Sequence, residues 1–119
     1  MSYDKGLAER VREILWDNRG FTEKTMFGGI CFLVYGNMAC GVLDDNLIIR
    51  VGPDGYQNAL DRPHTGIFDF TGRPMKGWVV VKPEGYESDH KLQKWVREGK
   101  EFALSLLPNN TTVIYEKAE

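Results

Sequence analysis

The two cysteines, Cys31 and Cys40, are the only thiols of the chain. Thiols can form disulfides, bind metal ions or carry redox chemistry. The hairpin predicted below puts both on one face of a sheet, displaced by one pair, with their Cβ atoms about 7 Å or more apart. A disulfide needs about 3.5–4.5 Å between these atoms, and structural zinc needs four ligands, which two cysteines without a nearby histidine do not supply. We therefore expect two buried thiols that pack in the core, with no metal site.

The other residue types that carry catalysis form no recognisable set. The two histidines, His64 and His90, lack the nucleophile, base and orienting group of a triad arrangement. The adjacent carboxylates Asp44-Asp45 lie at a predicted hairpin tip without a third acid, and turn chemistry explains them. Gly28-Gly29 precedes an apolar strand rather than the helix of a phosphate-binding loop, so it predicts a bend or bulge. The sequence predicts no catalytic residues, no cofactor and a non-enzymatic protein.

Three cations remain as candidate contacts for a ligand or a partner. Arg50 is predicted on the apolar outer face of the sheet, where it either reaches water or pairs with an acidic group on a partner or ligand. Arg73 and Lys76 flank the turn of the second predicted hairpin, and a solvated turn explains both. The alternative is a binding or enzymatic pocket for an anionic ligand near Arg50, Arg73 and Lys76.

Three helices are predicted to position these groups. Residues 4–17 show apolar side chains at i, i+4, i+7 and i+8, which indicates an amphipathic helix capped by Asp4. A short helix is expected over residues 53–60. A longer one runs from Ser88 or Asp89 to Leu107, in which Gly99 indicates a bend or close packing. The apolar side chains of the first helix are Leu7, Val11, Ile14 and Leu15.

Apolar runs separated by turn residues predict two hairpins. Strands over residues 30–35 and 38–43 meet at a turn of Gly36-Asn37, and a turn of Asp45-Asn46 leads to a third strand. A second hairpin joins residues 67–71 to 75–82. The expected fold is therefore α+β, a single domain over residues 1–119, with an antiparallel sheet of about five strands in the order α-βββ-α-ββ-α. Residues 111–115 are β-prone and fit either an added edge strand or a loose end.

Both faces of the central hairpin are apolar in this register. One face, taken as the core face, collects Cys31, Leu33, Tyr35, Met38, Cys40, Val42, Leu47, Ile49 and Val51. The outer face collects Ile30, Phe32, Val34, Ala39, Gly41, Leu43, Ile48 and Arg50. An apolar face of this extent indicates a cover beyond the chain's own helices. We therefore expect a protein partner or self-association, for example a homodimer, through Ile30, Phe32, Val34, Leu43 and Ile48.

Composition limits the class of protein. The 119 residues are 42% hydrophobic and 27% charged, which is typical of a globular domain. The formal net charge of -2 and pI near 5.7 disfavour direct nucleic-acid binding, which usually needs a basic surface. The charged N-terminus carries no apolar run long enough for a signal peptide or a membrane span. We expect a cytoplasmic protein with no membrane contact.

A series of short motifs in a fixed order resembles the TfoX N-terminal domain family over roughly residues 24–107. The motifs are Met26-Phe27-Gly28-Gly29, Gly36-Asn37-Met38, Asp44-Asp45-Asn46-Leu47, Arg50-Val51-Gly52, Phe70-Thr71-Gly72-Arg73-Pro74-Met75 and residues 92–95. The resemblance implies helices packed on an antiparallel sheet and offers no catalytic residues. It further implies a stand-alone N-terminal domain related to regulators of natural-competence genes, which act as transcriptional coactivators beside a cyclic-AMP receptor protein.

Overall fold

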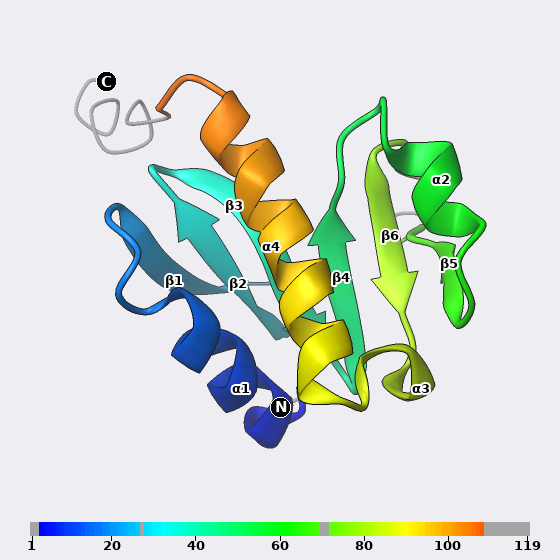
Figure 1. Cartoon of the computed structure of the whole chain (residues 1–119), viewed down its shortest axis with the longest axis horizontal. Helices are drawn as coiled ribbons and strands as arrows, with labels where there is room; N and C mark the ends of the chain where they lie inside the picture. The colour runs from blue at the N-terminus through cyan, green and yellow to red at the C-terminus, as the bar shows by residue number, and fades with distance from the viewer. Residues whose placement is uncertain (1–2, 27, 70–71, 109–119) are drawn as a thin grey trace.

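An antiparallel sheet carries helices on one of its faces (Figure 1). The computed structural model describes residues 3–26, 28–69 and 72–108. In chain order the elements are α1 (Lys5–Leu15), β1 (Phe21–Met26), β2 (Gly29–Val34), β3 (Asn37–Leu43), β4 (Asn46–Arg50), α2 (Tyr56–Leu60), β5 (Thr65–Ile67), β6 (Trp78–Val81), α3 (Pro83–Tyr86) and α4 (Asp89–Ser105). The strands follow one another across the sheet as β1-β2-β3-β4-β6-β5, each pair antiparallel. The predicted α+β class is confirmed.

The described residues form six strands where about five were predicted. The additional strand is β1, whose interior residues are all exposed. Such a strand lacks the apolar alternation on which the prediction relied, because it lies at the sheet edge with little to bury. In the second hairpin residues 65–67 pair with β6, where residues 67–71 were predicted to do so. The β-prone residues 111–115 lie outside the described residues.

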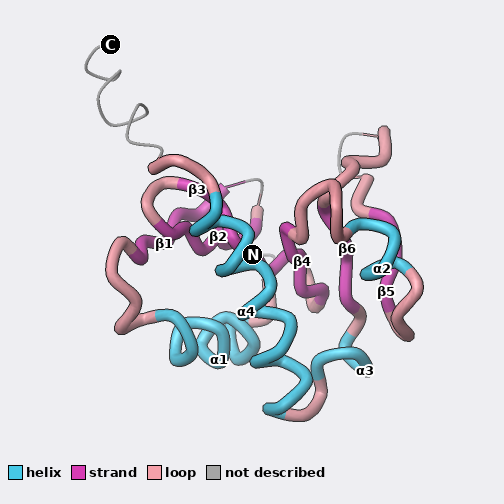
Figure 2. Tube along the Cα trace, turned by 45° about the horizontal axis from the view of Figure 1, so that its top comes forward, coloured by secondary structure: helices cyan, strands magenta, loops and turns pink. Residues whose placement is uncertain are grey.

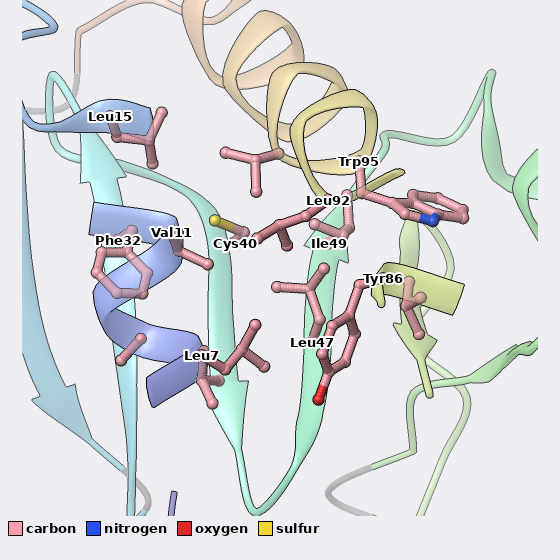
Figure 3. Close-up of a cluster of buried hydrophobic side chains, with 14 of the residues drawn as sticks. Leu7, Val11, Leu15, Phe32, Cys40, Leu47, Ile49, Tyr86, Leu92 and Trp95 are labelled. Carbon is pink, nitrogen blue, oxygen red and sulfur yellow. The ribbon is translucent and has the colours of Figure 1, made fainter. Parts of the chain in front are cut away.

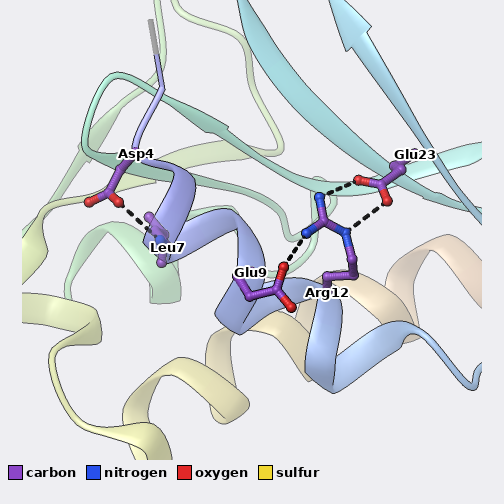
Figure 4. A network of polar contacts seen from close by, with 5 residues as sticks. All are labelled: Asp4, Leu7, Glu9, Arg12 and Glu23. Atoms are coloured by element: carbon purple, nitrogen blue, oxygen red, sulfur yellow. Dashed lines mark hydrogen bonds and ion pairs between the residues drawn. The ribbon is translucent and has the colours of Figure 1, made fainter. Parts of the chain in front are cut away.

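Both long helices begin at a side-chain cap and pack by an apolar stripe. The Asp4 carboxylate accepts a hydrogen bond from the Leu7 backbone N–H at 3.0 Å (Figure 4), and the Ser88 hydroxyl accepts one from the Lys91 N–H at 3.2 Å. Such caps satisfy backbone donors that have no partner inside the helix. On α4, Gly99 lies directly on β3, because a Cβ added there would come 2.3 Å from the Ala39 carbonyl oxygen. The expected close packing at Gly99 is confirmed.

The main core lies between the sheet and the helices (Figure 3). The residues labelled there are Leu7, Val11 and Leu15 of α1, Phe32, Cys40, Leu47 and Ile49 of the sheet, Tyr86 of α3, and Leu92 and Trp95 of α4. Ala59 of α2 joins the same cluster. All four helices of the described residues therefore bury side chains against one face of the sheet.

The first hairpin turns one residue earlier than predicted. Its turn is Tyr35-Gly36, with φ of 51° and 81°, so that Val34 pairs with Asn37. Positive φ at both central residues is the geometry of a hairpin turn that matches strand twist. The Asn37 amide instead donates a hydrogen bond to the Leu107 backbone oxygen at 2.9 Å, just beyond the end of α4. This long-range contact fixes Asn37 in the strand rather than in the turn.

Because the turn is displaced, the side chains of β2 lie on the faces of the sheet opposite to those predicted, so part of the predicted outer face is wrong. The register also shifts between Phe32 and Leu33, so Phe32 pairs with Cys40 while Leu33 pairs with Met38. A change of one residue sends every side chain of a strand to the opposite face. Residues predicted to face outward, namely Ile30, Phe32 and Val34, therefore face the helices, and Cys31 and Leu33 face outward.

The side-chain orientations of residues 40–43 of β3 and of residues 47–49 of β4 were predicted correctly, although the predicted turn between the two strands was wrong. The second turn is Asp44-Asp45, which pairs Leu43 with Asn46 rather than with Ile48. This is a shift of two residues in the pairing, and a shift of two preserves the face of each side chain. Cys40 and Ile49 thus lie in the core, while Ile48 lies on the outer face. Arg50 ends β4, and its guanidinium lies between the rings of Trp78 and of Phe102 on α4.

Candidate functional site

The face of the sheet opposite the helices carries an apolar groove. Figures 1 and 2 show α1 and α4 on one side of the sheet, and the groove lies on the other side, with a volume of about 210 Å³. We call it the outer groove. Its lining residues are Met26, Gly29, Ile30, Cys31, Met38, Gly41, Val42, Leu43, Ile48, Phe68, Met75 and Trp78. None of them carries a charge, so the groove favours apolar groups.

Two strand glycines line the floor of the groove, where neighbouring atoms approach too closely for a side chain. Gly41 pairs with Cys31 on one side and Ile48 on the other, at the middle of the outer face. It contributes no side chain, and Gly29 of β2 lines the same floor. At either position a Cβ would come within 3 Å of a neighbouring backbone oxygen, 2.5 Å at Gly29 and 2.9 Å at Gly41. Glycine inside a strand weakens the strand and often marks the close approach of another group.

Sulfur-containing side chains form much of the wall. Met26, Met38 and Met75 line the groove together with Cys31. Methionine is flexible and polarisable, so a wall of this kind can adapt to apolar groups of different shape. Burial raises the pKa of the Cys31 thiol, while the charge of Lys24 opposes that rise. The thiol is therefore protonated near neutral pH and acts as an apolar wall rather than as a nucleophile.

Two side chains from the connection between β5 and β6 line one side of the groove. Phe68 and Met75, both half-buried, come from this connection and lie against the outer face. The Phe68 ring lies 6.4 Å from the Trp78 ring, centroid to centroid.

Arg50 lies beside the Trp78 wall of the groove. Its guanidinium carbon is 5.1 Å from the centroid of the Trp78 ring and 5.3 Å from that of Phe102, both within cation–π range. The side chain is half-buried, and desolvation lowers its pKa from the ordinary value. Among the described residues no carboxylate forms an ion pair with it. The cation therefore keeps its N–H donors available.

The predicted contact residues are only partly brought together. Arg73 and Lys76 are exposed on the connection that also carries Phe68 and Met75, whereas Arg50 is held by aromatic rings. Neither exposed cation has a hydrogen bond or ion pair within the described part of the chain. The interpretation of these two as a solvated turn agrees with this exposure, and a ligand contact at either stays a prediction.

The predicted interface residues divide between the two faces. Leu43 and Ile48 line the outer groove as expected. Ile30 touches the groove but is 6% exposed and belongs to the helix-side core. Phe32 and Val34 are 0% exposed on the helix side, so no partner reaches them and their predicted outward placement is wrong. The groove residues that sequence reasoning missed are Met26, Gly29, Cys31, Met38, Val42, Phe68, Met75 and Trp78.

One polar network joins α1 to the edge strand and is structural (Figure 4). The Arg12 guanidinium donates to both oxygens of Glu23, at 2.7 and 2.8 Å, and also to Glu9. The hydrogen bond from Arg12, opposed by burial, lowers the pKa of Glu23. The network lies on the helix side, away from the groove. Within residues 3–26, 28–69 and 72–108 no cluster of three or more His, Cys, Asp or Glu residues is placed to hold a metal ion.

No helix among the described residues has the length and apolar character needed to cross a membrane.

The chain matches the family model of the TfoX N-terminal domain over residues 13–103 of its 119 residues. The matched region begins within α1 and ends within α4, so it includes every strand and the whole outer groove. No curated protein matches the chain.

Proposed function

The chain belongs to the TfoX N-terminal domain family, and on that premise we propose that it is a regulator-like domain that acts through contacts with a partner protein. The outer groove is the proposed contact surface. A role related to competence or transcription follows from the family alone and is part of the proposal. The protein works without catalysis and in the cytoplasm in this proposal.

The observation that carries the proposal is an apolar hollow on the sheet face that the helices leave open. Leu43, Phe68 and Trp78 each stay partly accessible around it. Large apolar patches that stay accessible mark contact sites more often than they mark packing faults. The strand glycines at the floor of the groove are sites of close approach, since atoms of the neighbouring strands lie within 3 Å of where a Cβ would be.

The partner that fits best is a different protein with a projecting apolar side chain. Two copies related by a two-fold axis would oppose groove to groove, and two hollows do not fill each other. The homodimer expected from the sequence also rested on Phe32 and Val34, which are buried in the core. Aromatic and methionine side chains commonly anchor interfaces, so a partner residue of this kind is expected in the groove.

The experiment compares two leucine variants of the full chain. Leu43→Glu puts a carboxylate at the groove, while Leu104→Glu makes the same change on α4, where Leu104 is 45% exposed. Both should fold as the unmodified chain does, checked by thermal unfolding. Proteins captured from the native cell should bind the unmodified chain and the Leu104→Glu variant but not Leu43→Glu. Equal capture by both variants would remove the groove from the proposal.

Light scattering measures self-association in the same preparations. We expect a monomer over the accessible concentration range, because the groove alone offers no self-complementary surface. A dimer abolished by Leu43→Glu and kept by Leu104→Glu would replace the separate partner with a second copy of this chain. A dimer unaffected by either variant would place self-association elsewhere on the surface.

A further inference from the structure

One cation lies next to the apolar outer groove. Ile48 lines the hollow, and Arg50 is two residues further along β4, about 7 Å away along the strand. Trp78 pairs with Arg50 across β4 and β6 and also lines the groove. Arg50 does not itself line the groove, but its guanidinium carbon lies 5.1 Å from the centroid of the Trp78 ring, which does.

The Arg50 side chain is prepared to accept an anion. Aromatic rings lie over the guanidinium at 5.1 and 5.3 Å, and its N–H donors project in its own plane. No acceptor within the described part of the chain takes these donors. The buried side-chain polar atom without a partner in the described residues is Asn46 Oδ1, so the Arg50 nitrogens are accessible to solvent and to an anion. A planar carboxylate matches the guanidinium edge by two parallel hydrogen bonds.

The sheet surface favours a ligand with a single polar group. The backbone N–H and C=O groups of β2, β3 and β4 pair with neighbouring strands, so the groove floor offers none to a peptide main chain. A peptide backbone lying in the groove would lose water without replacement. Because the groove walls are uncharged and one cation lies beside them, we expect a ligand that is apolar except for one negatively charged group.

The volume also fits a small apolar group. A cavity of about 150 Å³ lined by aliphatic and aromatic side chains holds benzene in another protein. The outer groove, at about 210 Å³, has room for a ring or a chain of several carbons. Flexible walls at Met26, Met38 and Met75 allow some variation in its shape.

We propose that the outer groove binds an amphipathic monocarboxylate, with its alkyl or aryl part in the hollow beside Gly41 and its carboxylate on the N–H edge of Arg50. This site goes beyond the protein contact proposed above and does not depend on it. The ligand and a partner side chain would occupy the same space, so the two bind in competition. Ligand concentration would then control access of the partner.

The test uses three probes of equal chain length on the full chain: octanoate, octanol and octylammonium. The readout is the NMR signals of the methionine methyl groups, since Met26, Met38 and Met75 all line the groove. Octanoate should shift these three signals. Octanol and octylammonium should bind with an affinity at least about tenfold lower than that of octanoate. This comparison needs no variant. Equal binding of octanoate and octanol, or no shift of the three signals up to about 10 mM octanoate, would overturn the proposal.

Two arginine variants then locate the carboxylate. Arg50→Gln should weaken octanoate binding about tenfold or more while leaving octanol binding unchanged. Arg97→Gln, which changes an exposed arginine on α4, should bind octanoate as the unmodified chain does. Should Arg50→Gln fail to fold, Arg50→Lys keeps the charge and should retain part of the preference for octanoate. Unchanged octanoate binding in a folded Arg50→Gln variant would remove Arg50 from the site.

Binding of octanoate with no capture of a partner would leave the ligand site standing and remove the protein contact. Capture of a partner that Leu43→Glu abolishes, without any octanoate binding, would do the reverse. The two proposals are therefore separated by their own measurements.

Discussion

The carbonyl oxygen of Ala39 occupies the space that a side chain at Gly99 would need. An added Cβ would lie 2.3 Å from that oxygen and 3.1 Å from the carbonyl carbon, well inside contact distance. Ala39 is the extra residue between the two pairing registers of β2 and β3. The helix therefore rests on the irregular point of the sheet, and it does so because residue 99 lacks a side chain.

We expect Gly99→Ala to lower the free energy of unfolding by about 1–3 kcal/mol. Alanine would favour the helix by about 1 kcal/mol, but the backbone carbonyl cannot move aside without shifting the helix or the strand. Chemical denaturation measures the change. Gly66→Ala is the control, since nothing lies within 4 Å of a Cβ at that position. Stabilisation by Gly99→Ala would show that the contact is looser than described.

In the Asp44-Asp45 turn between β3 and β4, we expect substitution by glycine to stabilise the chain at Asp44 but not at Asp45. Asp44 has φ of 55°, a conformation that glycine adopts without steric cost. Asp44→Gly keeps the backbone oxygen that accepts from the Asp4 N–H at 2.7 Å. We expect thermal unfolding to show a gain of about 0.5–1 kcal/mol for Asp44→Gly and a loss for Asp45→Gly, whose φ is not positive. The opposite order would contradict the turn geometry.

The pairing of Arg12 with Glu23 predicts a dependence of stability on pH. The hydrogen bond from Arg12 holds the pKa of Glu23 below its ordinary value of 4.5 in the folded chain. The stabilisation is therefore complete above pH 4.5 and is lost as pH falls through the lower folded-state pKa. Because the pair is partly exposed, it contributes at most about 1 kcal/mol.

Glu23→Gln should accordingly lower the free energy of unfolding at pH 7, and the loss should be smaller at pH 3, because the stabilisation diminishes as the pH falls below 4.5. Glu13→Gln, at an exposed position of α1 with no ion pair in the described residues, serves as the control and should be neutral at both pH values. Denaturant unfolding over this range of pH makes the comparison. A loss that persists undiminished at pH 3 would mean that packing, not charge, stabilises the contact.

The Tyr86 hydroxyl is expected to stabilise the chain up to about pH 10. It donates a hydrogen bond to the Asp45 backbone oxygen at 2.6 Å. Burial, followed by the charges of Asp4 and Asp45, raises its pKa to about 12. A raised pKa favours the protonated form, so the stabilisation is complete below the ordinary value of 10.0 and is lost as pH rises through 12.

Tyr86→Phe should therefore cost about 1 kcal/mol at pH 7, as expected for one partly buried hydrogen bond. The cost should shrink between pH 10 and 12. Tyr56→Phe is the control, because its hydroxyl has no hydrogen bond within the described part of the chain. Equal effects of the two variants would show that the bond to Asp45 contributes nothing.

Sequence patterns predicted α1, α2, α4 and most strands for reasons that are local, and missed the one-turn helix α3. The spacing of Leu7, Val11 and Leu15 and the caps at Asp4 and Ser88 act within a few residues, so they are readable without the fold. The edge strand β1 was missed because its exposed side chains show no alternation. The family resemblance was likewise carried by short motifs in order, and the family match confirms it.

Which residues line the outer groove depends on the pairing register of β2 and β3, and the sequence alone left that register ambiguous. Gly36-Asn37 and Tyr35-Gly36 are both acceptable turns, and the contact between Asn37 and the Leu107 oxygen selects the second. One residue of shift moved Phe32 into the core and Cys31 onto the groove wall. Gly41 within a strand was the one signal in the sequence for a hollow at this place.

By itself the sequence determined an α+β domain, its two long helices and the apolar character of both sheet faces, since these follow from side-chain type and spacing. Only the tertiary structure decided which residues occupy each face, and that Phe68 and Met75 join them in the groove. The reason is that strand pairing has a period of two, so side-chain placement turns on a single residue fixed by contacts distant in the chain.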